Sequence, residues 1–342
     1  MMVDTPSPKL SQRVSRHPAL SQLFFALWLV SLPAYCLIRL FALAPVLDAA
    51  TALVALSLFL LSLSHCVENL GWPRSLAMLG AACGIALAME YLGSAYGFVF
   101  GRYSYTNRLG PLAFGQVPVL IPVAWFMMLY PAWAVGGLFA SALQLREKSG
   151  QWVRRPVGDT ATGARDYHAA TVLAGLARVC VAALAMTAWD LSLDPRMTAD
   201  GAWVWHTAGP YFGIPLTNFV GWFVTSALIY LAWSRLDNDT LSALASVYAP
   251  ADPDSSDTYP HVRDTHVLLL PILAYVLQWL GESLANGLFW GGLGVAACVF
   301  VGMGLFAGPA AYILWQHSQR TLARGPVKGH ASMEQPGVLP DG

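Results

Sequence analysis

Charged residues are scarce in this chain of 342 residues: Asp, Glu, Lys and Arg make up 11% of it, against roughly 25% in an ordinary soluble domain. Lys and Arg together number 19, as do Asp and Glu, so the formal net charge is zero. A balanced charge excludes a basic nucleic-acid-binding protein and an acidic disordered chain. Because 56% of the residues are apolar, too few charges remain to cover a soluble surface. The composition therefore predicts an integral membrane protein.

Paired cysteines and clustered histidines are also missing. The five cysteines form no C-x-x-C pair. We therefore expect them to act as small buried apolar side chains and to form no disulfide framework. The eight histidines form no H-x-x-H box, which argues against di-iron desaturases, hydroxylases and ketolases. No Ser-His-Asp elbow, P-loop or D-D-x-x-D motif appears. We therefore expect no metal and no cofactor, and any enzyme built on this chain would use acid–base chemistry in an apolar pocket.

Long apolar runs are what the chain has instead. A membrane helix needs about 20 mostly apolar residues, and the qualifying segments are 20–43, 46–66, 75–96, 117–141, 169–190, 213–233, 265–286 and 288–316. Only Asn286 and Gly287 separate the last two, so seven spans is the alternative to eight. The predicted fold is an all-α, polytopic membrane helix bundle, with one transmembrane domain over 20–316.

The positive charges predict the orientation of this bundle. With the N-terminus in the cytoplasm, 14 Lys and Arg residues fall on the inside and 4 on the outside, as the positive-inside rule requires. Both termini are then cytoplasmic, and the protein lies in the cytoplasmic membrane. We expect a polar N-terminal segment 1–19, flexible cytoplasmic loops at 142–168 and 234–264, and a disordered tail at 317–342.

Ionisable side chains inside a membrane are costly and are candidates for function. Under this topology four carboxylates fall in the outer third of the bilayer: Glu90, Asp190, Asp194 and Glu282. Asp190 and Asp194 lie one turn apart, so they share a helix face if the helix continues. Arg178 lies nearer the middle of the membrane, where we expect a structural ion pair with one of these carboxylates.

Two outside loops, in the stretches 90–122 and 189–222, combine aromatic residues, glycine and proline with these acids. Trp and Tyr also gather at the membrane interface, and an aromatic belt explains scattered rings well. It explains less well why carboxylates, Asn218 and rigid turns crowd the same loops. The pattern therefore favours a ligand site.

The second loop carries a long and specific string: Asp190, Asp194-Pro195, Trp203-x-Trp205, Gly213-Ile214-Pro215, Asn218-Phe219 and Gly221-Trp222. Together with the first loop, it resembles the membrane-bound carotenoid 1,2-hydratases of bacteria and archaea, which include the bisanhydrobacterioruberin hydratases. The resemblance extends loosely over 50–316. The N-terminal segment and the 234–264 linker do not match this family.

The resemblance implies an enzyme of carotenoid biosynthesis. It would add water across the terminal C1–C2 double bond of an acyclic carotenoid end group and give a tertiary alcohol. The implied partners are a carotenoid (lycopene, gamma-carotene or a C50 precursor), water and membrane lipid, with no nucleic acid. Association with other enzymes of the carotenoid pathway is a further expectation.

The residue types suit this reaction. A carboxylic acid buried among apolar groups stays protonated at neutral pH and can protonate an alkene. Aromatic faces stabilise the resulting cation by roughly 0.5–2 kcal/mol each. We assign the proton donor to Asp190 or Asp194 without choosing between them, and the partner or water-orienting base to Glu90. We expect the substrate contacts from Tyr103, Tyr105, Trp203, Trp205, Tyr211, Asn218 and Trp222.

Alternatives remain open at this point. Ion pairs with Arg102 or Arg196 would hold a carboxylate ionised and remove its acid role, and Glu282 is a further candidate for the acid. The same groups would serve an isoprenoid isomerase or cyclase. Outside the enzymes, the chain could be a carotenoid-binding protein or a transporter. A transporter would favour inverted repeats and polar sites at the midplane, whereas no repeat is evident here.

Overall fold

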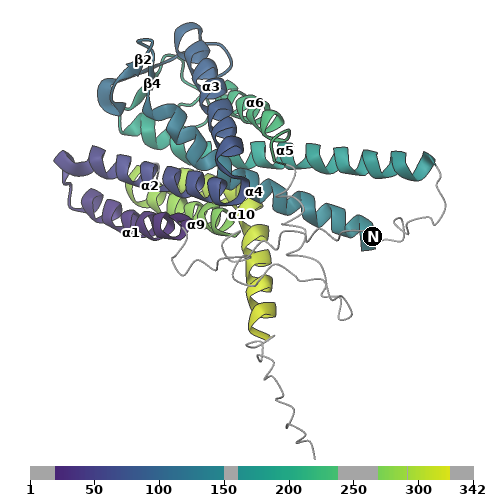
Figure 1. Ribbon diagram of the computed structural model, residues 1–342. Helices are drawn as coiled ribbons and strands as arrows, with labels where there is room; N and C mark the ends of the chain where they lie inside the picture. The colour runs from purple at the N-terminus through teal and green to yellow at the C-terminus, as the bar shows by residue number, and fades with distance from the viewer. Residues whose placement is uncertain (1–19, 150–160, 238–268, 291, 324–342) are drawn as a thin grey trace, which may run out of the picture.

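The computed structural model of the protein describes residues 20–149, 161–237, 269–290 and 292–323. It is a bundle of helices with short strands at one end (Figure 1). The helices are α1 (Leu20–Leu40), α2 (Ala44–Leu70), α3 (Trp72–Tyr96), α4 (Leu120–Ser149), α5 (Ala161–Ala199), α6 (Leu216–Trp233), α9 (Leu270–Ala285) and α10 (Gly292–Ala323). The strands are β1 (Tyr103–Tyr105), β2 (Leu112–Ala113), β3 (Val117–Pro118) and β4 (Trp203–Trp205), and a 3-10 turn, η1, covers Asn107–Leu109.

Seven helices among the described residues are long and apolar enough to cross a membrane: α1, α2, α3, α4, α5, α6 and α10. The expected span 265–286 appears as α9, which has 16 residues, followed by one π-helical turn, η2 (Asn286–Trp290). Asn286 and Gly287, which were expected to separate two spans, lie inside this turn. Helix α10 begins at Gly292, whose φ of 64° glycine adopts without strain. The helical, multi-pass architecture is confirmed.

The expected polar loop 142–168 is shorter than the sequence indicated. Helix α4 continues to Ser149 and α5 begins at Ala161, so helix covers both ends of the expected loop 142–168. Helix α10 continues to Ala323, past the expected end of the membrane domain at 316. The segment 1–19, the linker from 238 to 264 and the tail from 324 lie outside the described residues.

Helix α4 lies at the centre of the bundle. Most of its span Leu120–Ser141 is buried, against a small share of the α1 span, and it packs against α2, α3, α5 and α9. Gly136 makes the contact with α5 close, because a Cβ there would lie 2.6 Å from the Arg178 carbonyl oxygen. Small residues let membrane helices approach in this way.

The outer surfaces of the peripheral helices are apolar. Leu23, Leu27 and Val30 on α1 and Leu293 and Leu305 on α10 are all exposed. Soluble monomers rarely expose contiguous apolar surface of this extent. Lipid tails are the surroundings that suit such a surface.

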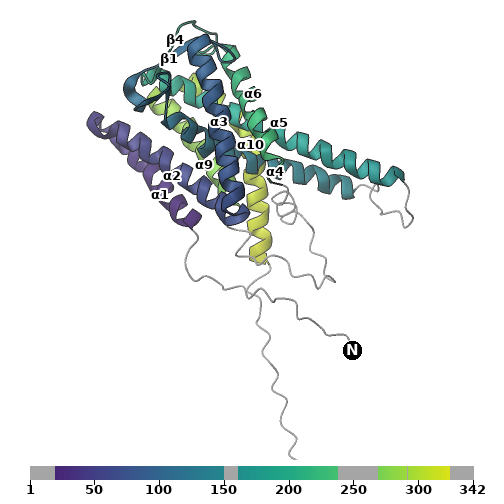
Figure 2. The same ribbon diagram turned by 45° about the horizontal axis from the view of Figure 1, so that its top comes forward.

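The strands gather where α3 and α5 end and where α4 and α6 begin, which we call the strand end of the bundle. β1 pairs antiparallel with β4, so that Tyr103 lies opposite Trp205 and Tyr105 lies opposite Trp203. β2 and β3 form a second small ladder. Figure 2 shows β1 and β4 beside the end of α3. The two loops singled out in the sequence are therefore joined by backbone hydrogen bonds.

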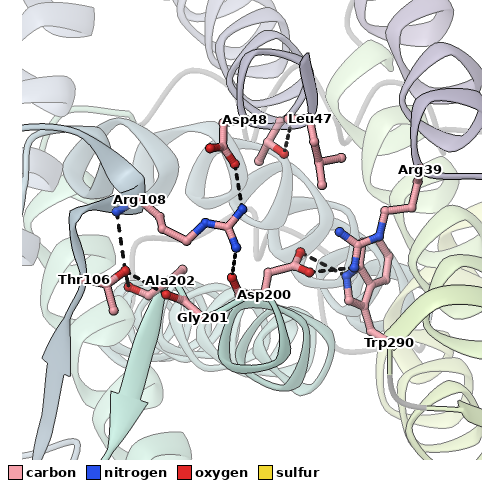
Figure 3. Close-up of polar contacts among 10 residues, drawn as sticks. Arg39, Leu47, Asp48, Thr106, Arg108, Asp200, Gly201, Ala202 and Trp290 are labelled. Carbon is pink, nitrogen blue, oxygen red and sulfur yellow. Dashed lines mark hydrogen bonds and ion pairs between the residues drawn. The ribbon is translucent and has the colours of Figure 1, made fainter. Parts of the chain in front are cut away.

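Side-chain contacts tie other helix ends to the strand end (Figure 3). Arg39, at the end of α1, binds Asp200, which follows α5, at 2.6 Å, and Trp290 of η2 donates to the same carboxylate at 3.0 Å. Arg108 binds Asp48 of α2 at 3.1 Å. These helix ends therefore meet at one end of the bundle, as the expected topology requires. The side of the membrane that this end faces stays a prediction.

The expected partner of Arg178 was wrong. Arg178 pairs with Asp237 at 3.0 Å, at the far end of the bundle from the outer carboxylates, and both side chains are 1% exposed. The guanidinium lies 3.6 Å from the ring centre of Trp133, and the Trp133 indole donates to Asp237 at 2.6 Å. The polar residues around Asp237 predicted a flexible loop at this position. The buried arginine makes it part of the core instead.

Removal of one partner from this pair should destabilise the protein. We expect Asp237→Ala to lower the free energy of unfolding by about 3–5 kcal/mol, since Arg178 would be left buried without its counter-charge. The measurement is thermal unfolding in detergent. Asp48→Ala is the control, because its pair with Arg108 is largely exposed and such pairs contribute about 0–1 kcal/mol. Equal effects of the two substitutions would contradict a structural role for the buried pair.

Candidate active site

The four carboxylates expected at one depth separate into two groups. Glu90 of α3 and Asp190 and Asp194 of α5 are buried near the strand end, each at most 5% exposed. Glu282 of α9 forms an ion pair with Arg196 at 2.9 Å. An arginine contact holds a carboxylate ionised and removes its acid role, and here Arg196 makes that contact with Glu282. Glu90, Asp190 and Asp194 stay candidates for the acid.

Asp190 and Asp194 share one hydrogen-bond donor. They lie one turn apart on α5, which continues through both, as the spacing predicted. The amide nitrogen of Asn218, in the first turn of α6, donates to Asp190 Oδ2 at 2.6 Å and also to Asp194 Oδ2. Trp203 donates to Asp194 Oδ1 at 2.8 Å. Asp190 Oδ1 has no hydrogen-bond partner among the described residues. The two acids are therefore close together but differ in their hydrogen bonds.

Glu90 has three donors of its own. Its Oε2 accepts from Tyr103 at 2.5 Å and from Tyr105 at 2.7 Å, and its Oε1 accepts from Trp125 at 2.8 Å. Alternate residues of a strand point to one face, so β1 presents both phenols to the same carboxylate. Three donors to one buried carboxylate satisfy its oxygens and fix its position.

The β1–β4 ladder places aromatic rings over the acids. Tyr103 and Trp205 have ring centres 5.0 Å apart, and Tyr105 and Trp203 have theirs 5.8 Å apart. Each pair is formed by residues directly opposite in the ladder. The register of two short strands therefore fixes four of the predicted contact residues on one face.

A small cavity of about 40 Å³ lies between these groups, and we call it the acid cavity. Its polar walls are Glu90, Asp194 and Asn218. Its aromatic walls are Phe100, Tyr103, Tyr105, Trp125, Trp189, Trp203, Trp205 and Trp222. A space of this size holds a few water molecules. Acids, aromatic faces and room for water are thus combined in one cavity.

Two predicted site residues lie outside the acid cavity. Asp190 does not line it, and it stands behind Asn218. The Tyr211 hydroxyl donates to the Leu191 carbonyl at 2.9 Å, and its ring packs against Phe219. The other predicted contact residues all line the cavity. Arg102, the other arginine considered, is exposed and forms no ion pair with a described carboxylate.

The sequence did not mark Phe100, Trp125 or Trp189 as site residues, although all three line the acid cavity. Trp125 stacks on Trp222 with ring centres 4.1 Å apart. A buried indole N–H needs an acceptor, and this is the one signal that could have paired Trp125 with an acid. Phe100 fits because a Cβ at Gly93 would lie 2.8 Å from its ring.

A multi-pass membrane protein with a buried acid site is the class that the fold and the site define. Residues 46–250, more than half of the chain and including every wall of the acid cavity, match the family described as carotenoid biosynthesis protein. The chain belongs to this family. The family resemblance predicted from the two loops is thereby confirmed.

One relative carries a more specific name. A bisanhydrobacterioruberin hydratase from Haloarcula japonica is 24% identical over 217 residues, which are 63% of this chain and 58% of that protein. The chain therefore spans less than two thirds of the length of that relative. No solved structure matches the chain.

The tyrosines at Glu90 give a testable property of the site. Burial, and then the charge of Glu90, raise the pKa of Tyr103 and of Tyr105 well above the usual range of a phenol. In the folded protein we therefore expect Tyr103→Phe and Tyr105→Phe to leave unchanged the tyrosinate absorbance gained between about pH 9 and pH 11. After unfolding, each variant should lose the absorbance of one tyrosine. A smaller gain in a folded variant would contradict the burial of that phenol beside a carboxylate.

Proposed function

We propose that this protein is a carotenoid 1,2-hydratase, which adds water to the terminal double bond of an acyclic carotenoid end group. One observation carries the proposal: Glu90, with three hydrogen-bond donors, and Asp194, one of a close acid pair, line the same cavity with aromatic walls. Membership of the carotenoid biosynthesis family supports the substrate class. The name of the relative supports the reaction.

The acid pair is the source of the proton. Asp190 and Asp194 flank one amide nitrogen and are almost fully buried. Two carboxylates this close in an apolar place cannot both be ionised, so the pair holds a proton.

Asp194 delivers this proton, because it lines the cavity and Asp190 does not. Its O–H bond breaks as a new C–H bond forms at the less substituted alkene carbon. The electron pair of the double bond makes that C–H bond and leaves a tertiary cation at the other carbon. The acid pair becomes more negative in the same step, which stabilises the cation beside it. Asp190 and Asn218 act as positioning residues.

Glu90 activates the water. It lines the same cavity as Asp194, and its three donors hold it in place. Water attacks the cation, a C–O bond forms, and the proton released passes to Glu90. That proton returns to the acid pair through water, so no proton is gained or lost over one turnover. The reaction needs no metal and no redox cofactor.

The membrane setting suits this substrate. The hydrocarbon core of a bilayer is roughly 30 Å thick, about the length of a linear C40 carotenoid, so a pigment lying along the helices brings an end group near the strand end. Water reaches the same depth. We place the protein in the cytoplasmic membrane with the strand end outside, because positive charges gather in the other loops. Association with other enzymes of the pathway stays a prediction.

The direct experiment is chromatography with mass spectrometry of pigments from a lycopene-producing host, with and without the gene. The expected product is a more polar pigment, heavier by one water for each modified end. A new pigment of unchanged mass would identify an isomerase or cyclase. Unchanged pigments from lycopene, from a monocyclic carotenoid and from a C50 carotenoid, with the protein inserted, would favour a binding protein without catalysis.

Substitution of the acids tests the assigned roles. We expect Asp194→Asn and Glu90→Gln each to lower the hydration rate by about 10²–10⁴-fold, the usual contribution of general acid–base catalysis. The rate is followed as hydrated pigment formed per unit of inserted protein.

Asp48→Asn is the matched control, since this carboxylate is exposed at the same end of the bundle and its loss should leave the rate unchanged. Unaltered hydration in Asp194→Asn would remove the acid role from Asp194. Loss of folded protein is checked by size-exclusion chromatography in detergent.

A further inference from the structure

A second cavity adjoins the acid cavity. Its volume is about 150 Å³, and its walls come from α1, α2, α4, α5 and α9, with Trp290 of η2. The two cavities share four walls: Ile121, Ala124, Leu193 and Trp203. We call the second one the chain cavity. Helices α1, α2 and α9, which form its outer walls, contact one another (Figures 1 and 2).

The walls of the chain cavity are mostly apolar. Leu32 of α1, Val54 and Leu58 of α2, Met127 of α4 and Leu277 of α9 approach it from different sides. Such a lining suits a hydrocarbon.

Three polar residues of the chain cavity, Arg196, Gln278 and Glu282, contact one another. Arg196 pairs with Glu282 at 2.9 Å, and Gln278 donates to Glu282 at 2.6 Å. Their charges cancel, so this wall does not demand a charged ligand.

The shared wall contains a small residue. Ala124 of α4 is partly accessible, whereas Ile121, Leu193 and Trp203 are buried. Trp203 also donates to Asp194, so one indole borders both the reacting acid and the second cavity. A ligand that spans the two cavities would therefore pass over Ala124 and beside Trp203.

We propose that the chain cavity holds the hydrocarbon segment next to the reacting end group, and so selects substrates in which an isoprenoid chain follows that end group. This inference rests on the proposed function. A cavity of about 150 Å³ is comparable with one that binds benzene, so it takes about one isoprene unit. The reacting double bond then lies beside Asp194, where the two cavities meet at Trp203, and the rest of the chain lies in lipid.

Gly281 of α9 allows the chain cavity to be filled. It lines the cavity, and a Cβ at this position would meet no atom within 4 Å. Gly281→Phe therefore adds a ring at the wall of the cavity without a clash at its first carbon. Gly84→Phe is the matched control, because Gly84 of α3 is exposed, also has open space around it and lines neither cavity. Ala55→Leu narrows the cavity from α2, on another wall.

The experiment compares a long and a short substrate in detergent-solubilised protein. The long one is the acyclic carotenoid hydrated by the wild type, and the short one is 2-methyl-2-pentene, which carries the same alkene with almost no chain. We expect Gly281→Phe and Ala55→Leu to lower kcat/KM for the carotenoid by at least about tenfold, through lost apolar burial. Hydration of the short alkene should stay within about twofold of the wild type, as should both reactions in Gly84→Phe.

The outcomes separate this inference from the proposed function. A wild type that hydrates neither substrate would refute the proposed function. Wild-type carotenoid hydration in both filled variants would refute the chain cavity and leave the function intact. Equal loss of both substrates in both filled variants, with Gly84→Phe active, would also refute selective chain binding.

Discussion

Asn218 donates through one amide nitrogen to both Asp190 and Asp194, and much of the surrounding structure follows from that contact. The two acids are buried in an apolar bundle, where a second negative charge at the same place is prohibitively costly. In the proposed reaction the pair therefore keeps one proton. Helix α6 has to begin where it does to put Asn218 in its first turn, and Trp203 must reach Asp194 from β4.

The aromatic residues at the strand end have two roles at once. Tyr103, Tyr105, Trp125 and Trp203 each donate a hydrogen bond to a carboxylate. Their rings also form the walls of the acid cavity. A polar residue with an apolar body meets both demands where water is scarce. The same side chains therefore satisfy the acids and provide the faces that a cation prefers.

The two ends of the bundle treat buried charge differently. At one end Arg178 neutralises Asp237 directly, and the pair stabilises the fold. At the strand end, no described Lys or Arg forms an ion pair with Glu90, Asp190 or Asp194. Neutral donors hold these acids, so a proton can move among them. The contrast separates the structural carboxylate from those assigned to the proposed reaction better than burial does, since all are buried.

The sequence by itself determined the membrane class, most of the spans, and the acids and aromatic residues of the two loops, because apolar length and costly polar groups are local properties of the chain. Only the tertiary structure decided which groups meet. Strand register places Tyr103 opposite Trp205. Trp125 lies on an apolar helix, where no polar neighbour in the sequence marks it as a site residue. Asp237 pairs with Arg178 although 59 residues separate them in the sequence. Contacts between distant segments depend on packing and register, which residue spacing within one segment does not encode.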